Sequence, residues 1–363
     1  MRILETFKKN LLFWAMMLFF FTSYIILILG KHRLFQTGED LAIYCQACWH
    51  YSNFRVPFVT VWIDTNILND HFGPIMVLLA QLFHLWTDPR ILLIAQQIIV
   101  VSGAIPIYFY AKATLKNQYY SLLFAFLYLY FIGIQSALSS DFHLAAITAG
   151  ILSFSLYFCL TDKWKFYWPS IFLLLLTKED TPVLISALGL YLVIFKRRSK
   201  YGLITIFISL AYYLLIYSLF LPIINSNQVF LYQGAGKANR IVNILIYSPG
   251  EFFKTFVWPP VKLRNIALCL WSFGFLPVAS PIFWIIAPTN LLRFFSDEAR
   301  YSLHYQYSAT LTPILAFAAI GVFAKCSWLK TVFLFLAIIG TLSSTCFFRQ
   351  SSSFSFFFQT VSF

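Results

Sequence analysis

The chain has 363 residues, of which 60% are hydrophobic and only 11% are charged, and its net charge is +13. A soluble domain carries about 25% charged residues, so this composition excludes an ordinary soluble enzyme. Apolar stretches of about 20 residues, the length that crosses a bilayer as a helix, recur throughout, and they are too continuous for barrel strands. The sequence therefore predicts an all-α, polytopic membrane helix bundle.

The first predicted span covers residues 11–30 and follows the basic residues Arg2, Lys8 and Lys9. A cleaved signal peptide is the alternative, but the apolar run is too long for one, and no small-residue cleavage site precedes Lys31. We therefore expect a retained anchor with a cytoplasmic N-terminus.

Further spans follow in chain order, for a total of about 10–11 membrane helices. They are expected near residues 91–111, 119–138, 145–160, 166–177, 182–195, 201–222, 307–324 and 331–347, with a proline-broken pair of short helices over 266–292. Residues 1–348 would form one transmembrane domain, and 349–363 a short Ser/Phe-rich tail. Two outer segments, 31–90 and 223–264, are long. The first contains apolar stretches at 41–54 and 74–86, which we place along the membrane surface.

Basic clusters set the orientation, because short cytoplasmic loops are enriched in Lys and Arg. Five predicted loops carry almost no acidic residues and hold Arg2, Lys8, Lys9, Lys112, Lys116, Lys163, Lys165, Lys196, Arg197, Arg198, Lys200, Lys325 and Lys330. The positive charge thus indicates a multi-pass protein of the bacterial plasma membrane, attracted to the anionic inner leaflet, and it requires no nucleic acid partner.

Acidic residues occur in short clusters at the ends of the apolar segments, mostly on the opposite, outer side. The clusters are Glu39-Asp40, Asp70-His71, Asp141-Phe142-His143, Lys178-Glu179-Asp180 and Asp297-Glu298. Ionisable groups near hydrocarbon are costly and are usually functional. Together the clusters predict a site at one mouth of the bundle.

These motifs resemble a known family in both their order and their spacing. They are Asp40-Leu41-Ala42-Ile43-Tyr44-Cys45-Gln46, His71-Phe72-Gly73-Pro74, Asp141-Phe142-His143, Lys178-Glu179-Asp180 and His304-Tyr305. The chain resembles a bacterial family of predicted membrane proteins known only as a domain of unknown function. That family in turn is similar to the GT-C glycosyltransferases, such as protein O-mannosyltransferases and lipid A aminoarabinose transferases.

The resemblance implies an inverting transfer of a sugar from a polyprenyl-phosphate donor at the outer membrane face. An acidic residue in the first outer loop of such enzymes acts as base on the acceptor, and a second acidic motif lies in the next outer loop. Asp40 matches the first position, with Glu39 beside it, and Asp141 matches the second. No cofactor is certain, and a divalent metal remains an open possibility.

The same chemistry can be argued from the residues alone. Displacing a phosphate from an anomeric carbon requires a base on the attacking hydroxyl and cations or donors on the departing phosphate. Arginine suits phosphate because its guanidinium binds two oxygens at once. We expect the substrate to contact Asp70, His71, His143, Lys178, Glu179, Asp180, Arg293, Arg300, His304 and Tyr305.

Each motif also has a purely structural interpretation. Asp40 could cap a helix that begins near Leu41, and Asp70 could shape the turn before Pro74. Residues 178–180 could form a capped turn with an internal Lys–Glu pair, Lys178 with Glu179. The arginines could extend to lipid headgroups. Asp141 and His143 could be ordinary polar residues at the membrane interface, whereas in a loop mouth they could converge on a metal or a sugar.

The segment Cys45-Gln46-Ala47-Cys48-Trp49-His50 invites a redox or metal interpretation. Haem attachment would require His directly after the second Cys, and a zinc site would require further ligands at suitable spacing. We therefore favour packing as small apolar side chains.

Two other functions compete with a lipid-linked sugar transferase. A transporter would have internal repeats and broken helices near the bilayer midplane, and Pro277 and Pro281 do break one predicted helix. A non-catalytic membrane assembly subunit is the other alternative. The gathering of charges at one mouth, and the absence of a visible repeat, favour the transferase.

Overall fold

The computed structural model describes residues 8–61, 65–69, 71–224, 234–296, 298–325 and 330–351. Helices make up nearly all of its regular structure. The strands in the described part are β1 (Phe58–Val59) and β2 (Thr65–Asn66), which pair antiparallel with Phe58 opposite Asn66. The predicted all-α class is therefore confirmed.

The first half of the chain supplies the anchor, the first outer loop and the helices that follow it. These elements are α2 (Leu11–Arg33), α3 (Glu39–Ser52), η1 (Ile67–Asn69), α4 (Ile75–Ala80), η2 (Gln81–His84), α5 (Arg90–Ser102), α6 (Ala104–Leu115), α7 (Gln118–Leu129), α8 (Ile132–Ser139), α9 (Leu144–Leu160) and α10 (Trp164–Leu175).

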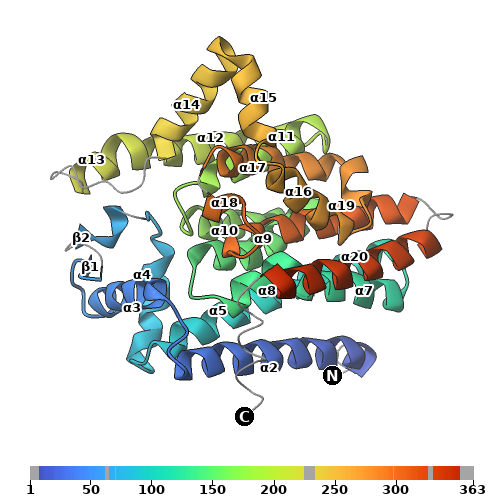
Figure 1. Ribbon diagram of the computed structural model, residues 1–363, viewed down its shortest axis with the longest axis horizontal. Helices are drawn as coiled ribbons and strands as arrows, with labels where there is room; N and C mark the ends of the chain where they lie inside the picture. Colours follow the sequence, from blue (N-terminus) through green and yellow to red (C-terminus); the bar gives the residue numbers. More distant parts are fainter. Residues whose placement is uncertain are drawn as a thin grey trace.

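The second half begins with a closely packed helix pair and ends with the two last apolar helices. Its elements are α11 (Thr181–Ile194), α12 (Ser199–Leu215), η3 (Ile216–Phe220), α13 (Leu221–Ile224), α14 (Gly234–Tyr247), α15 (Pro249–Val257), α16 (Val261–Trp271), η4 (Leu276–Ala279), η5 (Pro281–Ile286), α17 (Ala287–Phe294), α18 (Glu298–Tyr301), η6 (Gln306–Ser308), α19 (Leu311–Lys325) and α20 (Lys330–Ser351). Figure 1 shows α14 and α15 projecting together from one side of the bundle.

Fewer helices have the length to cross a membrane than the hydropathy pattern predicts. Within the described residues, four helical stretches are long and apolar enough, or five if the bent α7–α8 pair is one span. The four are Leu11–Arg33, Arg90–Leu115, Ser199–Ile224 and Gln306–Lys325. Other predicted spans, such as 145–160 and 182–195, form the apolar helices α9 and α11, which have the expected lengths of 17 and 14 residues but are shorter than these four.

Breaks in the helices account for other differences. The predicted span 119–138 bends by 48° between α7 and α8. The pair of short helices expected over 266–292 is instead α16 followed by the 3₁₀ helices η4 and η5 and then α17. Pro277 and Pro281 lie in these 3₁₀ turns, where a missing backbone N–H costs less than it would inside an α-helix.

Polar contacts tie loops together at the two ends of the bundle. At the basic end, Lys196 and Arg198 both contact Asp162, across the α9–α10 and α11–α12 loops. At the other end, Lys31 Nζ donates to the Ser139 carbonyl over 2.6 Å. Figure 1 shows α3, α4 and the two strands gathered at the end away from the N-terminus.

Helices α11 and α12 approach closely because each has a glycine at the contact. A Cβ on Gly189 would lie 2.9 Å from the Gly202 carbonyl oxygen, and one on Gly202 would lie 2.7 Å from that of Gly189. Small residues permit such backbone contact between membrane helices. This contact packs α12 against the bundle, although only 17% of its apolar stretch is buried within the protein.

The first outer loop folds onto the bundle. Helix α3 begins two residues before the expected stretch at 41–54, and α4 with η2 replaces the stretch at 74–86. Both bury side chains such as Tyr44 and Met76 in one apolar cluster with α5. Both stretches are helical, as predicted, and each helix packs one of its faces against the rest of the protein.

The two ends make the predicted orientation testable. Cysteine introduced at Phe54, which is 94% exposed, should react with a membrane-impermeant maleimide in intact cells. Cysteine at the exposed Ser199, in the basic end, should react only after the cells are permeabilised. The reverse labelling pattern would overturn the orientation.

Candidate functional site

The N-terminus of helix α3 is capped by the carboxylate of a residue distant in the sequence. Its N-cap is Gly38, which has no side chain to accept the first backbone N–H groups. The buried Asp141 takes this role, because its Oδ2 accepts from Leu41 N over 3.1 Å and its Oδ1 accepts from Phe142 N over 2.8 Å. The interpretation of Asp40 as the cap is therefore wrong: Asp40 lies within the first helical turn.

The Asp141 carboxylate is hydrogen-bonded to backbone N–H groups and is largely shielded from solvent. It is only 6% exposed, and a Cβ on Gly38 would lie 3.0 Å from its Oδ2. Burial raises the pKa of Asp141, and hydrogen bonds from Phe142, Leu41 and Gly38 lower it in part. This carboxylate is suited to positioning α3, and with it Asp40.

Asp40 points toward His143, the residue that precedes α9. Its Oδ2 lies 3.5 Å from His143 Nδ1, and its side chain is 47% exposed while that of His143 is buried. Burial, with smaller effects of His71 and Lys178, lowers the pKa of His143 to about 3. A neutral imidazole protonated at Nδ1 would orient the Asp40 carboxylate and leave its other oxygen accessible.

The loop that carries Asp141 and His143 is held by a residue that the sequence analysis missed. Gln96 of α5 is fully buried. Its amide nitrogen donates to the carbonyls of Asp141 and Ala137, and its Oε1 accepts from His143 N over 2.7 Å. An available signal was the pair Gln96-Gln97 inside an apolar span, because polar groups at that depth require partners.

A second acidic residue joins the first outer loop to the turn between α10 and α11. Glu179 is 1% exposed; its Oε1 lies 3.3 Å from His71 Nδ1, and its Oε2 accepts from Phe72 N over 3.1 Å. Burial raises the pKa of Glu179, but His71 and Lys178 lower it more, so it stays ionised. The neighbouring Asp70 lies outside the described residues.

Lys178 and Asp180, from the same turn, line a pocket with a cavity volume of about 80 Å³. Lys178 Nζ is 3.7 Å from Asp180 Oδ2. Burial lowers the pKa of Lys178, but Asp180 and Glu179 raise it further, and the amine stays charged. The ion pair within the turn is thus Lys178–Asp180 and not the predicted Lys–Glu pair, because Glu179 turns to His71.

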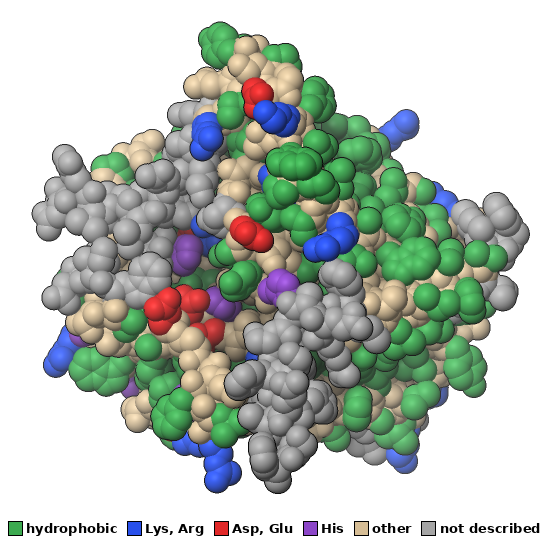
Figure 2. All heavy atoms as spheres, in the orientation of Figure 1, with side chains coloured by type: hydrophobic (Ala, Val, Ile, Leu, Met, Phe, Trp, Pro, Cys, Tyr) green, Lys and Arg blue, Asp and Glu red, His purple; other side chains and the backbone are tan. Residues whose placement is uncertain are grey.

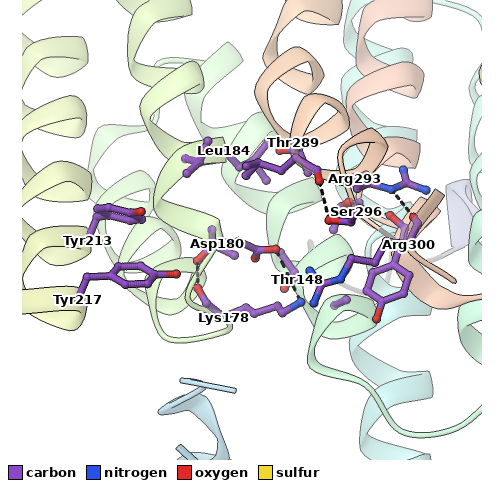
Figure 3. A pocket seen from close by; sticks show the side chains of 16 residues that line it. Thr148, Lys178, Asp180, Leu184, Tyr213, Tyr217, Thr289, Arg293, Ser296 and Arg300 are labelled. Atoms are coloured by element: carbon purple, nitrogen blue, oxygen red, sulfur yellow. Dashed lines mark hydrogen bonds and ion pairs between the residues drawn. The ribbon is translucent and has the colours of Figure 1, made fainter. Parts of the chain in front are cut away.

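A second cation approaches from the other side of this pocket. Lys178 Nζ and the Arg300 guanidinium lie over the Tyr307 ring at 5.6 and 5.7 Å from its centroid. Figure 3 shows Lys178 and Arg300 extending toward each other, with Tyr213 and Tyr217 of the α12–η3 segment on the opposite wall. The three tyrosines were not predicted, because single aromatic residues in aromatic-rich spans carry no distinguishing signal.

Arg293 also lines the pocket, but its guanidinium is largely engaged by the protein. Nε donates to the Arg300 carbonyl over 2.9 Å, and the other nitrogens donate to Asn290 and Ser308. It is only 7% exposed, so the alternative in which it extends to lipid headgroups is wrong. We assign Arg293 to holding Arg300 in place.

The remaining predicted residues lie outside the pocket lining. His304 and Tyr305 are exposed in the turn before η6, and burial with the nearby Arg264 lowers the pKa of His304. Glu39 is exposed beside Asp40. Figure 2 shows acidic and histidine side chains grouped in a hollow on one face, with basic side chains around them.

The described residues contain no group of three or more His, Cys, Asp or Glu side chains placed to hold a metal ion. Asp141 and His143 contact different groups, the backbone N–H of Leu41 and the carboxylate of Asp40. Cys45, Cys48, Cys159 and Cys269 are free thiols.

The first outer loop, the two acidic turns and the helices around them all fall within one sequence family. Residues 31–361 match DUF2079, a family described as predicted membrane proteins. The chain belongs to this family. No curated protein matches the chain. DUF2079 membership agrees with the apolar helices and covers every candidate site residue, while its description specifies no reaction.

Stability against pH tests the neutral state of His143. An unfolded histidine takes up a proton near pH 6.5, but the folded His143 does so only near pH 3. Above pH 6.5 His143 is neutral in both states and its protonation does not affect stability. Between pH 6.5 and pH 3 only the unfolded chain takes up this proton, which lowers the free energy of unfolding by up to about 1.4 kcal/mol per pH unit. Thermal unfolding of purified protein at a series of pH values should give a shallower loss for His143→Asn than for wild type.

The exposed His84 supplies the control, because His84→Asn removes a histidine that is not buried. This variant should keep the wild-type pH dependence. Identical pH dependence for wild type and His143→Asn would contradict a buried neutral imidazole.

Proposed function

We propose that this protein transfers a sugar from a polyprenyl-phosphate donor to an acceptor at the outer face of the membrane. The observation that carries the proposal is the convergence of Lys178 and Arg300 in a pocket beside a lipid-facing helix, α12. A phosphate attached to a lipid requires cations at membrane depth and an apolar path for its chain. The pocket volume of about 80 Å³ suits a phosphate group.

The proposed base lies close to the proposed phosphate position. Ala145 and Thr148, in the first turns of α9, line the pocket, and His143 precedes that helix. His143 contacts Asp40, whose side chain is 47% exposed, more than those of Asp180 and Glu179. A sugar on the phosphate would then lie between the cations and Asp40, and Asp180 could accept hydrogen bonds from its hydroxyls.

The reaction is a single displacement at the anomeric carbon. The acceptor hydroxyl oxygen forms a bond to that carbon while the bond from carbon to the phosphate oxygen breaks, and the configuration inverts. The hydroxyl proton passes to Asp40, and polyprenyl phosphate leaves with its new charge near Lys178 and Arg300. Asp141, Gln96 and Arg293 act by positioning these groups.

A transporter is the second candidate, favoured by the 48° bend between α7 and α8. Broken helices commonly surround transport sites. The bend falls at Tyr130 and Phe131, which do not line the pocket described above. Uptake of a solute by proteoliposomes without sugar transfer would support this candidate over the transferase.

Replacing Arg300 tests the phosphate position. Arg300→Gln should weaken binding of polyprenyl phosphate to the purified protein by roughly tenfold or more, the effect of losing a charged hydrogen bond. Lys254→Gln removes an outer-side cation whose side chain is 68% exposed and lies on α15, so it should leave binding unchanged. Native mass spectrometry with titrated lipid measures both. Equal affinities for the two variants would place the phosphate elsewhere.

Replacing Asp40 tests the base. Asp40→Asn keeps the side-chain shape and should keep donor binding, but transfer of labelled sugar to envelope acceptors should fall by about 10²-fold or more. Glu39→Gln is the matched control, one residue earlier on the same helical turn, and should retain activity. A transfer rate near wild type for Asp40→Asn would eliminate Asp40 as the base.

A further inference from the structure

A second pocket, with a cavity volume of about 370 Å³, lies in the first outer loop. Its walls come from α3, β1 and the segment around η2. Ligand pockets in proteins commonly measure about 300–1,000 Å³, so its size fits a small molecule better than a few waters. It is separate from the cation pocket, with which it shares no lining residue.

The Cys45–His50 motif forms one wall of this pocket. Cys45, Gln46, Trp49 and His50 all line it, and their four-residue spacings place them on one face of α3. Cys48 is buried in the apolar cluster, with Cys45 packed against it, as expected for small apolar side chains, while Cys45, Gln46, Trp49 and His50 also contribute a wall of the pocket.

The lining is aromatic and polar but uncharged. Besides the motif it includes Phe58, Thr60, Phe83 and Thr87, with no Asp, Glu, Lys or Arg among the described lining residues. Gln46 and Thr60 are joined by two hydrogen bonds of 2.9 and 3.1 Å, which fix their orientation. Such a surface suits neither a phosphate nor a metal ion.

Two further features point to a neutral ring with hydroxyl groups. Trp49 is 41% exposed, and Arg55 lies over its ring at 5.4 Å from the centroid, which holds the indole in place. His50 also lines the pocket, with its ring centroid 5.1 Å from that of Trp49, and an imidazole can donate or accept a hydrogen bond from a hydroxyl. Its Nδ1 is buried and has no hydrogen-bond partner among the described residues.

The position of the pocket relates it to the proposed base. Asp40 lies in the first turn of α3, and His50 lies ten residues later, which corresponds to about 15 Å along the helix axis. A ligand bound here could extend along α3 and present another part of itself to Asp40.

We propose that this pocket binds an uncharged saccharide unit of the acceptor. The assignment of that saccharide to the acceptor rests on the proposed function, whereas binding of a neutral saccharide does not. The Trp49 ring would stack on the sugar, and His50, Thr60 and Gln46 would bond to its hydroxyls.

Saccharide binding to the full-length protein in detergent tests the proposal. The probes are three uncharged trisaccharides, maltotriose, cellotriose and chitotriose, and saturation-transfer NMR measures binding. At least one should bind saturably, and Trp49→Leu should weaken it by about tenfold or more, the effect of losing one stacked aromatic contact. His50→Leu should also weaken it.

Trp86→Leu is the matched control. Trp86 is 40% exposed and carries Arg90 over its ring at 4.8 Å, but it does not line the pocket. Binding that is unaffected by Trp86→Leu and lost in Trp49→Leu supports the proposal. Absence of binding for all three saccharides, or equal loss in both variants, overturns it.

Polyprenyl-phosphate binding to the same samples separates the two proposals. Trp49→Leu should leave lipid binding at the wild-type level. If wild type binds saccharide at Trp49 but no polyprenyl phosphate, the transferase proposal fails while the saccharide pocket stands. If lipid binds and saccharide does not, the saccharide proposal alone fails.

Discussion

The buried carboxylate of Asp141 is the contact on which the arrangement of the outer face depends. It replaces a cap that Gly38 cannot provide, and so it fixes where α3 begins relative to the bundle. Without a side chain at residue 38, the carboxylate approaches the helix end closely. The direction of α3 then determines where Asp40 lies, and also where the wall of the larger outer pocket lies.

Glu179 performs a comparable role for the second half of the site. Its two oxygens engage His71 and the Phe72 backbone, so the turn that bears Lys178 is tied to the first outer loop. A buried charge without a partner would be costly, and each of these acids has partners from a distant segment. The same residues that stabilise the outer face therefore also set the spacing between the proposed base and the proposed phosphate position.

The two pockets differ in chemistry in a way that matches two different ligands. The smaller one is cationic and lies beside the lipid-facing α12, whereas the larger one is uncharged and aromatic. Helix α3 carries Asp40 in its first turn and Trp49, which lines the larger pocket, near its end. An enzyme that joins a lipid-linked donor to a separate acceptor requires this division of binding surfaces.

The sequence by itself determined the helical membrane class and most positions of helices. These follow from a local property, the length of the apolar stretches. It also predicted Asp40, His143 and Lys178 as site residues, because charged clusters at span ends are conspicuous. The tertiary structure decided which clusters meet and what each member does. Asp141 holds a helix 100 residues away in the chain, and Gln96 holds the loop of His143, because these partners depend on how distant helices pack. The bend between α7 and α8, the tyrosines around the cations and the pocket behind Trp49 likewise arise from packing, which hydropathy along one segment does not encode.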